Sequence, residues 1–360
     1  MKTFLPLLLA ALALPAAATD YYLRGNDTST NCSLDGNGSP VGWATTPGGA
    51  QASTKADDAT GIYHINGNVF RIATSTENLS FGGARLVFDG TNPALNDKYT
   101  ANATLTLDNL SVPDGQIGEI RAGNPSTLVL AGNPWTVGSG SFLSLNTGEK
   151  ETRTLRILST ITGTGLLAAT SGINDSRGVI TSGAGGTGTV SLEGDLSGFT
   201  GVLSAGEKGI TYEGGHATAV SHVTLKIAAT TAFPQSTPDG DVLLGSVVVT
   251  NGAKLAFACS VDSAEIRGWD FGTGAVPTVD VASGCTVRVF GPVSGTKGLN
   301  KTGAGTLIFK VGGDGAYGTI TLGSGTQTVS ASDLSAYAAR CEQWLEDRNG
   351  SAAAGTIFFF

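Results

Sequence analysis

The chain has 360 residues, of which 40% are hydrophobic, 14% are charged and 53 are glycine, and its formal net charge at pH 7 is −8. So much glycine without a strict three-residue period excludes collagen, and frequent runs of valine, isoleucine, leucine and threonine exclude a disordered chain. The acidic balance argues against nucleic acids and anionic membranes as partners. An all-β protein with many turns remains.

The N-terminus has the three parts of a secretory signal peptide. Lys2 supplies a positive charge, residues 4–14 form a short apolar run, and residues 16–18 are alanines that suit a cleavage site. We therefore expect residues 1–18 to be removed on export and the protein to be secreted or held at the cell surface. No later stretch is apolar for long enough to predict a membrane-spanning helix.

Residues 19–60 are polar and rich in turn-forming residues, and they contain Cys32, Trp43 and the pair Asp57-Asp58. A fold built from stacked strands has an open first edge, which must be covered to prevent association. We therefore expect residues 19–60 to form an N-terminal cap.

Short segments that alternate apolar and polar residues recur from residue 61 onward: Val69–Ile72, Arg85–Phe88, Thr104–Leu107, Ser126–Leu130 and Phe142–Leu145. Leu86, Leu105 and Leu128 are separated by 19 and then 23 residues. This spacing suits one coil of a parallel β-helix, although an antiparallel sandwich also places strands about ten residues apart. For residues 61–327 the parallel arrangement predicts about twelve coils and a rod on the order of 55 Å long, at ~4.8 Å per coil.

One stretch carries a specific resemblance. Residues 293–310 read V-S-G-T-K-G-L-N-K-T-G-A-G-T-L-I-F-K, which predicts three short strands joined by glycine turns. The stretch resembles the repeat of autotransporter-associated β-strand proteins, whose core Leu-x-Lys-Thr-Gly-x-Gly-Thr-Leu is matched by Leu299, Lys301, Thr302, Gly303, Gly305, Thr306 and Leu307. A weaker copy begins at residues 161–167. The resemblance implies a secreted, pectin-lyase-like, right-handed single-stranded parallel β-helix of the passenger type.

Residues 328–360 differ in character from the rest of the chain. Four apolar residues fall on one helical stripe: Leu334, Tyr337, Cys341 and Leu345. Ser332 would cap this helix and Asn349-Gly350 would end it. We expect a short C-terminal helix followed by a tail. Nothing here has the repeated strands of a membrane translocator, so the resemblance implies a passenger-like module that lacks its own translocator.

The usual catalytic and metal-binding signatures are absent from the sequence. His216 and His222 could form a metal site with Glu213, but their spacing fits no known metal-binding motif. His64 is far from them in the sequence, and we interpret all three histidines as structural or exposed. Residues 312–318 are similar to a calcium-binding nonapeptide, but Tyr317 takes the place of the ligand aspartate, so we interpret them as a turn. We predict no cofactor, with calcium needed only if the protein is a lyase.

The densest ionisable cluster comprises Asp262, Glu265, Arg267 and Asp270. Parallel β-helix lyases use clustered carboxylates to hold calcium against an acidic sugar, together with a lysine or arginine base. The cluster fits that pattern loosely, and a solvated loop between coils is the simpler interpretation. Five aromatic residues would either stack on sugar rings or fill the core: Tyr21, Tyr22, Trp43, Trp135 and Trp269.

Cys259 and Cys285 are 26 residues apart, close to one coil, and period-two alternation turns both inward. Residues stacked in neighbouring coils lie ~4.8 Å apart, within the roughly 4.4–6.8 Å Cα range of a disulfide. We therefore predict a Cys259–Cys285 disulfide, or at least direct stacking. Two alternatives remain: buried thiols on different faces, and a Cys32–Cys341 bridge that would join opposite ends of the rod.

Together these features predict a secreted or cell-surface module with a structural, adhesive or ligand-presenting role. Glycans or host cell-surface components are its expected partners. The alternatives are a carbohydrate-active enzyme, such as a polysaccharide lyase or hydrolase, and a glycan-binding protein on the same scaffold, since β-helices host both. Convergence of Asp262, Glu265 and Asp270 in a cleft would favour the lyase. Flat sheets with rows of serine, threonine and asparagine would favour the structural module.

Overall fold

The computed structural model describes the parts of the chain from which the fold can be followed. These are residues 18–25, 42–53, 58–72, 78–81, 83–91, 93–97, 102–122, 127–132, 134–148, 153–171, 187–206, 223–228, 246–249, 252–262, 268–272, 275–289, 291, 293–295, 297–311 and 317–351. The residues expected to form the signal peptide lie outside them, apart from Ala18.

The described strands form four sheets. Sheet A contains β1 (Asp20–Leu23), β2 (Trp43–Ala44), β3 (Ile62–His64), β6 (Arg85–Val87), β9 (Ser111–Val112), β12 (Trp135–Val137) and β15 (Ile161–Gly163). Sheet B contains β4 (Val69–Ile72), β7 (Ala94–Asp97), β10 (Ile117–Ala122), β13 (Phe142–Asn146), β16 (Leu166–Thr170), β18 (Val202–Ala205), β20 (Ser246–Val249), β23 (Gly268–Asp270) and β26 (Val293–Ser294).

Sheet C contains β5 (Asn78–Ser80), β8 (Ala103–Thr106), β11 (Thr127–Ala131), β14 (Thr154–Ile157), β17 (Thr189–Leu192), β19 (Thr224–Ile227), β21 (Lys254–Phe257), β24 (Thr278–Val281), β27 (Leu299–Thr302) and β30 (Gln327–Val329). Sheet D contains β22 (Val261–Asp262), β25 (Thr286–Val289), β28 (Thr306–Lys310) and β29 (Thr319–Leu322). The helix α1 spans Ala331–Ser351.

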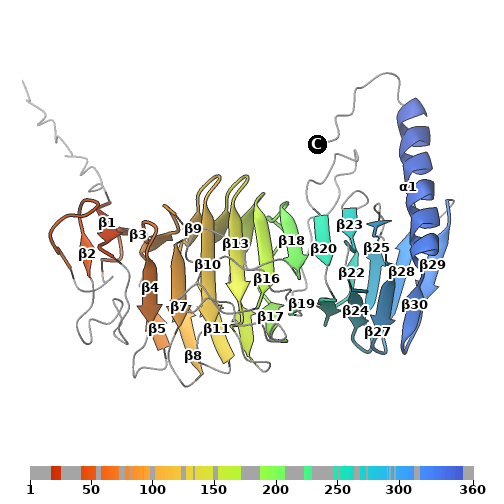
Figure 1. Cartoon of the computed structure of the whole chain (residues 1–360), viewed down its shortest axis with the longest axis horizontal. Coiled ribbons are helices and arrows are strands. Elements are labelled where there is room, and N and C mark those ends of the chain that lie inside the picture. Colours follow the sequence, from red (N-terminus) through yellow and green to blue (C-terminus); the bar gives the residue numbers. More distant parts are fainter. Residues whose placement is uncertain are drawn as a thin grey trace, which may run out of the picture.

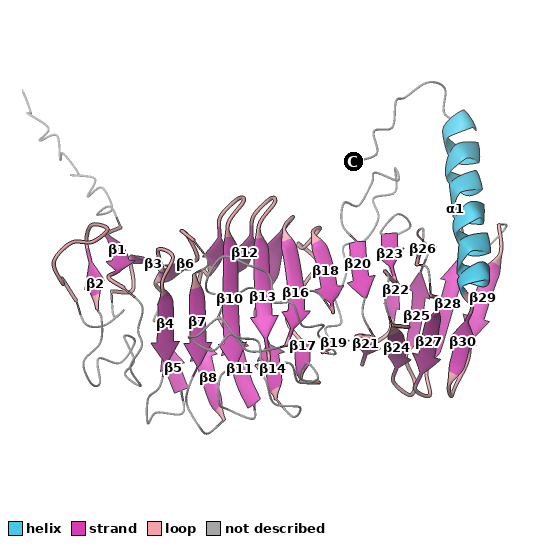
Figure 2. Ribbon diagram, viewed as in Figure 1, coloured by secondary structure: helices cyan, strands magenta, loops and turns pink. Residues whose placement is uncertain are grey.

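Strands that are neighbours in a sheet are not neighbours in the sequence. From β3 to β17 the chain visits sheets A, B and C in turn, so that each sheet receives every third strand (Figure 1). From β20 to β28 it visits sheets B, C and D in the same way. Figure 2 shows the resulting stack of strands, with the helix at the C-terminal end. The expectation of an all-β chain with parallel sheets and a C-terminal helix is confirmed.

The parallel order ends at both extremities of the described stack. β2 pairs antiparallel with β1 at the N-terminal end of sheet A. At the other end β29 pairs antiparallel with β28, and β30 with β27. The part predicted as parallel through residue 327 therefore closes with two reversed strands.

Alternation of side chains explains why these segments form strands. In β8, β11 and β28 every second residue is buried, as expected for strands with one face on a core. The inward residues of sheet C stack directly across strands as one apolar ladder: Leu105, Leu130, Ile157, Leu192, Ile227, Phe257 and Val281. Burial of each such side chain stabilises the fold by about 1.5–3 kcal/mol, so stacking between circuits builds the core.

Helix α1 begins at Ala331 and covers the C-terminal end of this core. The hydroxyl of Ser330, rather than that of Ser332 as expected, accepts the first-turn hydrogen bond from the Asp333 N–H at 3.1 Å. Leu334, Tyr337 and Cys341 are buried, as the apolar stripe predicts. The helix continues past the expected stop at Asn349-Gly350 to Ser351. No helix in the described residues is both long enough and apolar enough to cross a membrane.

Candidate binding groove on sheet C

Two rows of outward-facing residues run across sheet C, one residue per strand. The first row contains Thr127, Thr154, Thr189, Thr224, Lys254, Thr278 and Asn300. The second contains Val129, Arg156, Ser191, Lys226, Ala256, Asp280 and Thr302. Because neighbouring parallel strands lie ~4.8 Å apart, the first row places a polar group at a regular interval along the sheet, and the second row does so except at Val129 and Ala256.

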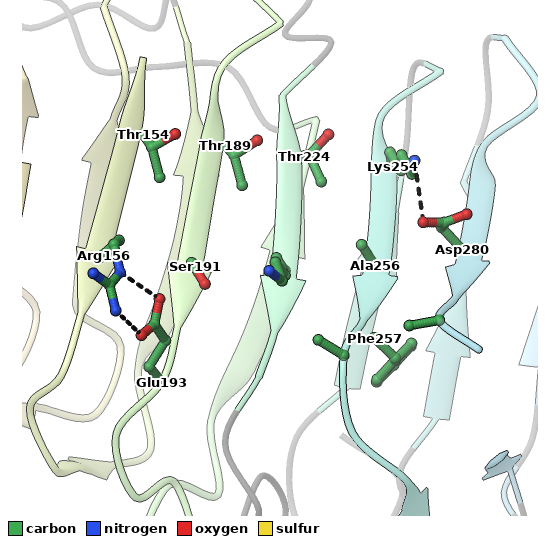
Figure 3. Close-up of a pocket in the computed structure, with 13 residues that line it drawn as sticks. Thr154, Arg156, Thr189, Ser191, Glu193, Thr224, Lys254, Ala256, Phe257 and Asp280 are labelled. Atoms are coloured by element: carbon green, nitrogen blue, oxygen red, sulfur yellow. Dashed lines mark hydrogen bonds and ion pairs between the residues drawn. The ribbon is translucent and has the colours of Figure 1, made fainter. Parts of the chain in front are cut away.

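A groove of about 580 Å³ crosses β14, β17, β19, β21 and β24 on this face (Figure 3). Figure 3 shows Thr154, Thr189 and Thr224 side by side on three neighbouring strands. Small side chains at Ala256, Ala258 and Ala282 leave space between the longer polar ones. The groove therefore combines hydroxyl groups, charged groups and a small apolar surface.

Arg156 and Glu193 form a two-point ion pair at one end of the groove. The Arg156 guanidinium donates from Nε to Oε1 of Glu193 at 2.9 Å and from Nη2 to Oε2 of Glu193 at 2.6 Å. These hydrogen bonds lower the pKa of Glu193, with smaller contributions from Ser191, the charge of Arg156 and the nearby Lys226. The paired geometry restrains both side chains and leaves Glu193 ionised at neutral pH.

Lys254 and Asp280 form a second ion pair at the other end, with an N–O distance of 3.3 Å. Partial burial would raise the pKa of Asp280, but the hydrogen bond from the Thr302 hydroxyl at 2.6 Å and the charge of Lys254 outweigh it, so the pKa is lowered. Asp280 therefore stays ionised and neutralises Lys254.

Lys226 lies between the two ion pairs in the register of the sheet. Within the described ranges its ammonium group forms no hydrogen bond or ion pair, although its charge helps to lower the pKa of Glu193. The groove therefore has three cations against two carboxylates. Such a site suits non-covalent binding of an anionic, hydroxyl-rich ligand.

The acidic cluster predicted from the sequence is only partly described. Asp262 ends β22 in sheet D, whereas Asp270 ends β23 in sheet B. Glu265 and Arg267 lie outside the described residues. A carboxylate oxygen of Asp270 accepts the Gly272 N–H at 2.7 Å, and the residue borders a separate cavity of about 240 Å³ with Ser294 and Glu342. Ligand binding by this cluster stays a prediction.

The aromatic and histidine candidates take structural positions where they are described. Trp43, Trp135 and Trp269 are fully buried, which confirms the core interpretation for them. Tyr21 stacks on Tyr63, and Tyr22 stacks on His64. The remaining candidates His216, His222 and Glu213, and residues 312–316 of the calcium-like turn, lie outside the described residues. In the part that is described, no group of three potential metal ligands occurs.

Cys259 and Cys285 occupy equivalent positions in successive circuits. Val261 and Val287 are directly paired in sheet D. Cys259 lies two residues before Val261 and Cys285 lies two residues before Val287, so the two cysteines stand at matching places before paired strands. Both thiols are half-buried and are not joined in a disulfide, and the neighbouring Cys285 contributes to the raised pKa of Cys259. This placement agrees with stacking of the two residues, and the disulfide itself stays a prediction. Cys32 lies outside the described residues.

The sequence did not reveal the groove, for a geometric reason. Thr154, Thr189, Thr224 and Lys254 are neighbours in one row, yet they are separated by 35, 35 and 30 residues in the chain. Intervening segments of different length hide the register. A search for outward Thr-x-(Arg/Ser/Lys) triplets at strand starts would have been the available signal. Neither the sequence nor the structure matches any protein-family model, curated protein or solved structure.

Proposed function

We propose that the chain is a secreted or cell-surface module, a right-handed single-stranded parallel β-helix that presents ligands or adheres to surfaces without catalysis. The regular visits to three sheets support a helical path of the backbone, and right-handed crossovers between parallel strands are the general rule. The similarity of residues 299–307 to autotransporter-associated repeats supports a passenger-type role.

The observation that carries this proposal is the pair of polar rows on sheet C. Threonines on successive strands give a repeated hydroxyl surface, and the groove within it contains charges that are already paired and positioned. Positioned polar groups reduce the ordering cost of binding. The lyase alternative has no comparable support, because the two residues of its predicted cluster whose strands are described, Asp262 and Asp270, end strands of different sheets.

Binding of the exported protein to an array of glycans and cell-surface components tests the proposal. We expect binding by the wild type and its loss in a Thr189→Glu/Thr224→Glu variant, which introduces two negative charges into the groove. Thr286→Glu, at the start of β25 in sheet D, is the matched control and should bind normally. Absence of binding to every component, or equal binding by all variants, would contradict the proposal.

Incubation with acidic polysaccharides, with and without calcium, separates the proposal from the enzyme. We expect no unsaturated product in either condition. A product that disappears in an Asp262→Ala or Asp270→Ala variant would establish the lyase instead.

A further inference from the structure

We propose that the groove on sheet C binds an oligosaccharide segment that carries one carboxylate among neutral sugars, with Lys226 as the partner of that carboxylate. This inference rests on the proposed ligand-presenting function and specifies its ligand. It comes from the charge balance of the groove, its hydroxyl rows and the position of its strands inside the sheet.

The charges of the groove favour a ligand with a single anionic group. Arg156 and Lys254 already have carboxylate partners, Glu193 and Asp280, so neither cation is available without breaking an ion pair. Lys226 is the cation left over among the described residues of the groove. A polyanion would bring further negative charges close to Glu193 and Asp280 and to a chain whose net charge is −8. The site therefore suits one carboxylate rather than a run of them.

Hydroxyl groups and small side chains select a sugar. Thr154, Thr189 and Thr224 follow one another at intervals of ~4.8 Å. Each hydroxyl can donate one hydrogen bond and accept others, which suits a ligand with a hydroxyl on nearly every carbon. Ala256 and Ala258 leave room for the apolar face of a ring beside Lys226. The paired carboxylates of Glu193 and Asp280 add fixed acceptors.

The position of the groove argues against a peptide ligand. β17, β19 and β21 each pair on both sides within sheet C, so their backbone groups are already used. An extended peptide that adds a strand needs a free sheet edge. A peptide would therefore have to bind through side chains alone, in a groove whose lining is mainly polar.

Titration calorimetry and saturation-transfer NMR on the exported protein test the inference. The probes are a hexasaccharide that carries one uronate among N-acetylhexosamines, its neutral N-acetylhexosamine counterpart, a sulfated hexasaccharide and a hexauronate. We expect the ligand with a single uronate to bind best. Lys226→Gln removes the charge that pairs with the carboxylate and should weaken this binding about five- to tenfold. A tenfold loss corresponds to about 1.4 kcal/mol of binding free energy. Added salt should weaken it as well, because Lys226 is partly open to solvent.

Two further variants sharpen the result. Lys297→Gln removes an exposed lysine outside the groove and should leave binding unchanged. Ala258→Glu keeps Lys226 but adds a negative charge at an exposed position of the groove, and it should abolish binding even if Lys226→Gln fails to fold.

The outcomes separate the inference from the function on which it rests. Preference for the neutral, sulfated or fully charged ligand, or binding that Lys226→Gln leaves unchanged, would overturn the inference and leave a ligand-presenting role intact. Failure of every glycan here and of every component on the array would remove both.

Discussion

Lys301 stabilises the turn that follows β27 through hydrogen bonds to backbone carbonyl groups. Its side chain is fully buried, and its ammonium group donates to the carbonyl oxygens of Gly303 at 2.8 Å, Gly305 at 2.5 Å and Gly323 at 2.5 Å. Burial lowers the pKa of Lys301, and the charge of Asp280 opposes this effect. A Cβ at Gly303 would lie 2.2 Å from the Val281 carbonyl oxygen, and its φ is +84°, so glycine is required there. The Lys-Thr-Gly-x-Gly pattern therefore has a direct structural cause.

We predict that Lys301→Met destabilises the protein by about 1–3 kcal/mol, the usual cost of leaving a buried hydrogen-bonding group without its partner. The methionine has a similar length but removes a donor to three carbonyl groups, of which that of Gly305 is buried. Chemical denaturation measures the change in unfolding free energy. Lys297→Met, at an exposed lysine, should change stability by no more than about 0.5 kcal/mol. Equal effects of the two variants would show that the carbonyl contacts contribute nothing.

His64 joins three segments near the N-terminal end of the stack. Its Nδ1 lies 2.6 Å from an oxygen of Asp89 and its Nε2 lies 3.2 Å from an oxygen of Asp20, while Tyr22 stacks on the ring. Burial opposes protonation, but the hydrogen bonds and charges of the two carboxylates outweigh it, so the pKa of His64 is raised above 6.5. Protonation therefore favours the folded protein.

The sign of this shift gives a pH dependence. Because the folded-state pKa is the higher one, the stabilisation is fully present below the unfolded-state value of about 6.5 and is lost as the pH rises through the folded-state value. We predict that His64→Gln costs about 1.5–3 kcal/mol at pH 5.5, the range for hydrogen bonds to charged groups, and less at pH 9. Denaturation of both proteins at the two pH values measures the difference. A cost that is the same at both pH values would contradict the assignment.

Individual strands could be predicted from the sequence because alternation is a local property. The expected segment Val69–Ile72 is β4, and the segments expected at residues 104–107, 126–130 and 142–145 coincide within one residue with β8, β11 and β13. Packing against the core determines these strands, so burial and the two-residue period agree.

Sheet partners and the groove could not be predicted in the same way. The register depends on where each circuit returns, and successive returns in sheet C differ in length, as the spacing of its threonine row shows. The reversed strands β29 and β30 carry the same alternating pattern as parallel ones, so their direction is not visible locally. Long-range pairing decides these features, and a single sequence does not contain a local signal for it.

Successive circuits bring Cys259 and Cys285 to equivalent positions, which makes a disulfide between them testable. We predict that the protein forms this bridge in an oxidising environment, which would stabilise it by about 3.5 kcal/mol through a closed loop of this length. Peptide mapping under non-reducing conditions identifies it. Free thiols at both residues, or a bridge from either to Cys32, would exclude the pairing.

The reduced protein provides an independent check on the environment of the pair. Burial, and to a smaller degree the neighbouring Cys285 thiol, raises the pKa of Cys259 to about 11. Only about 0.1% of this thiol is then ionised at pH 8, and thiolates are the reactive form. Alkylation of Cys259 at pH 8 should therefore be much slower than in the unfolded protein.

At the scale of the whole molecule, the two ends of the stack need protection. A stack of parallel strands leaves its last core layer and sheet edges open to association with a second molecule. In Figure 1 helix α1 lies at the C-terminal end, beside the last strands of the stack. Its Tyr337 donates to the carbonyl oxygens of Val289 at 3.2 Å and Gly291 at 3.4 Å, and its ring packs edge-on against Phe309 with centroids 5.6 Å apart.

We predict that removal of α1, by ending the chain after Ser330, converts the protein from its native state of assembly to larger, concentration-dependent species. The truncation exposes Phe309 and the apolar groups around it, and a contiguous exposed apolar surface at an open end favours end-to-end association. Light scattering after size exclusion, at several protein concentrations, measures the change. A chain that ends after Ser351 keeps the whole helix and is the matched control.

Misfolding of the truncated chain must be separated from exposure of a folded end. The Leu334→Ser/Tyr337→Ser variant keeps the full length but weakens the contact of α1 with the core, since both residues are buried there. It should also form larger, concentration-dependent species, but to a smaller extent than the truncated chain. Its far-UV circular dichroism should retain the β-structure of the wild type. If both variants keep the β-structure and neither associates, α1 does not protect this end of the stack, and the reversed strands β29 and β30 suffice to close it.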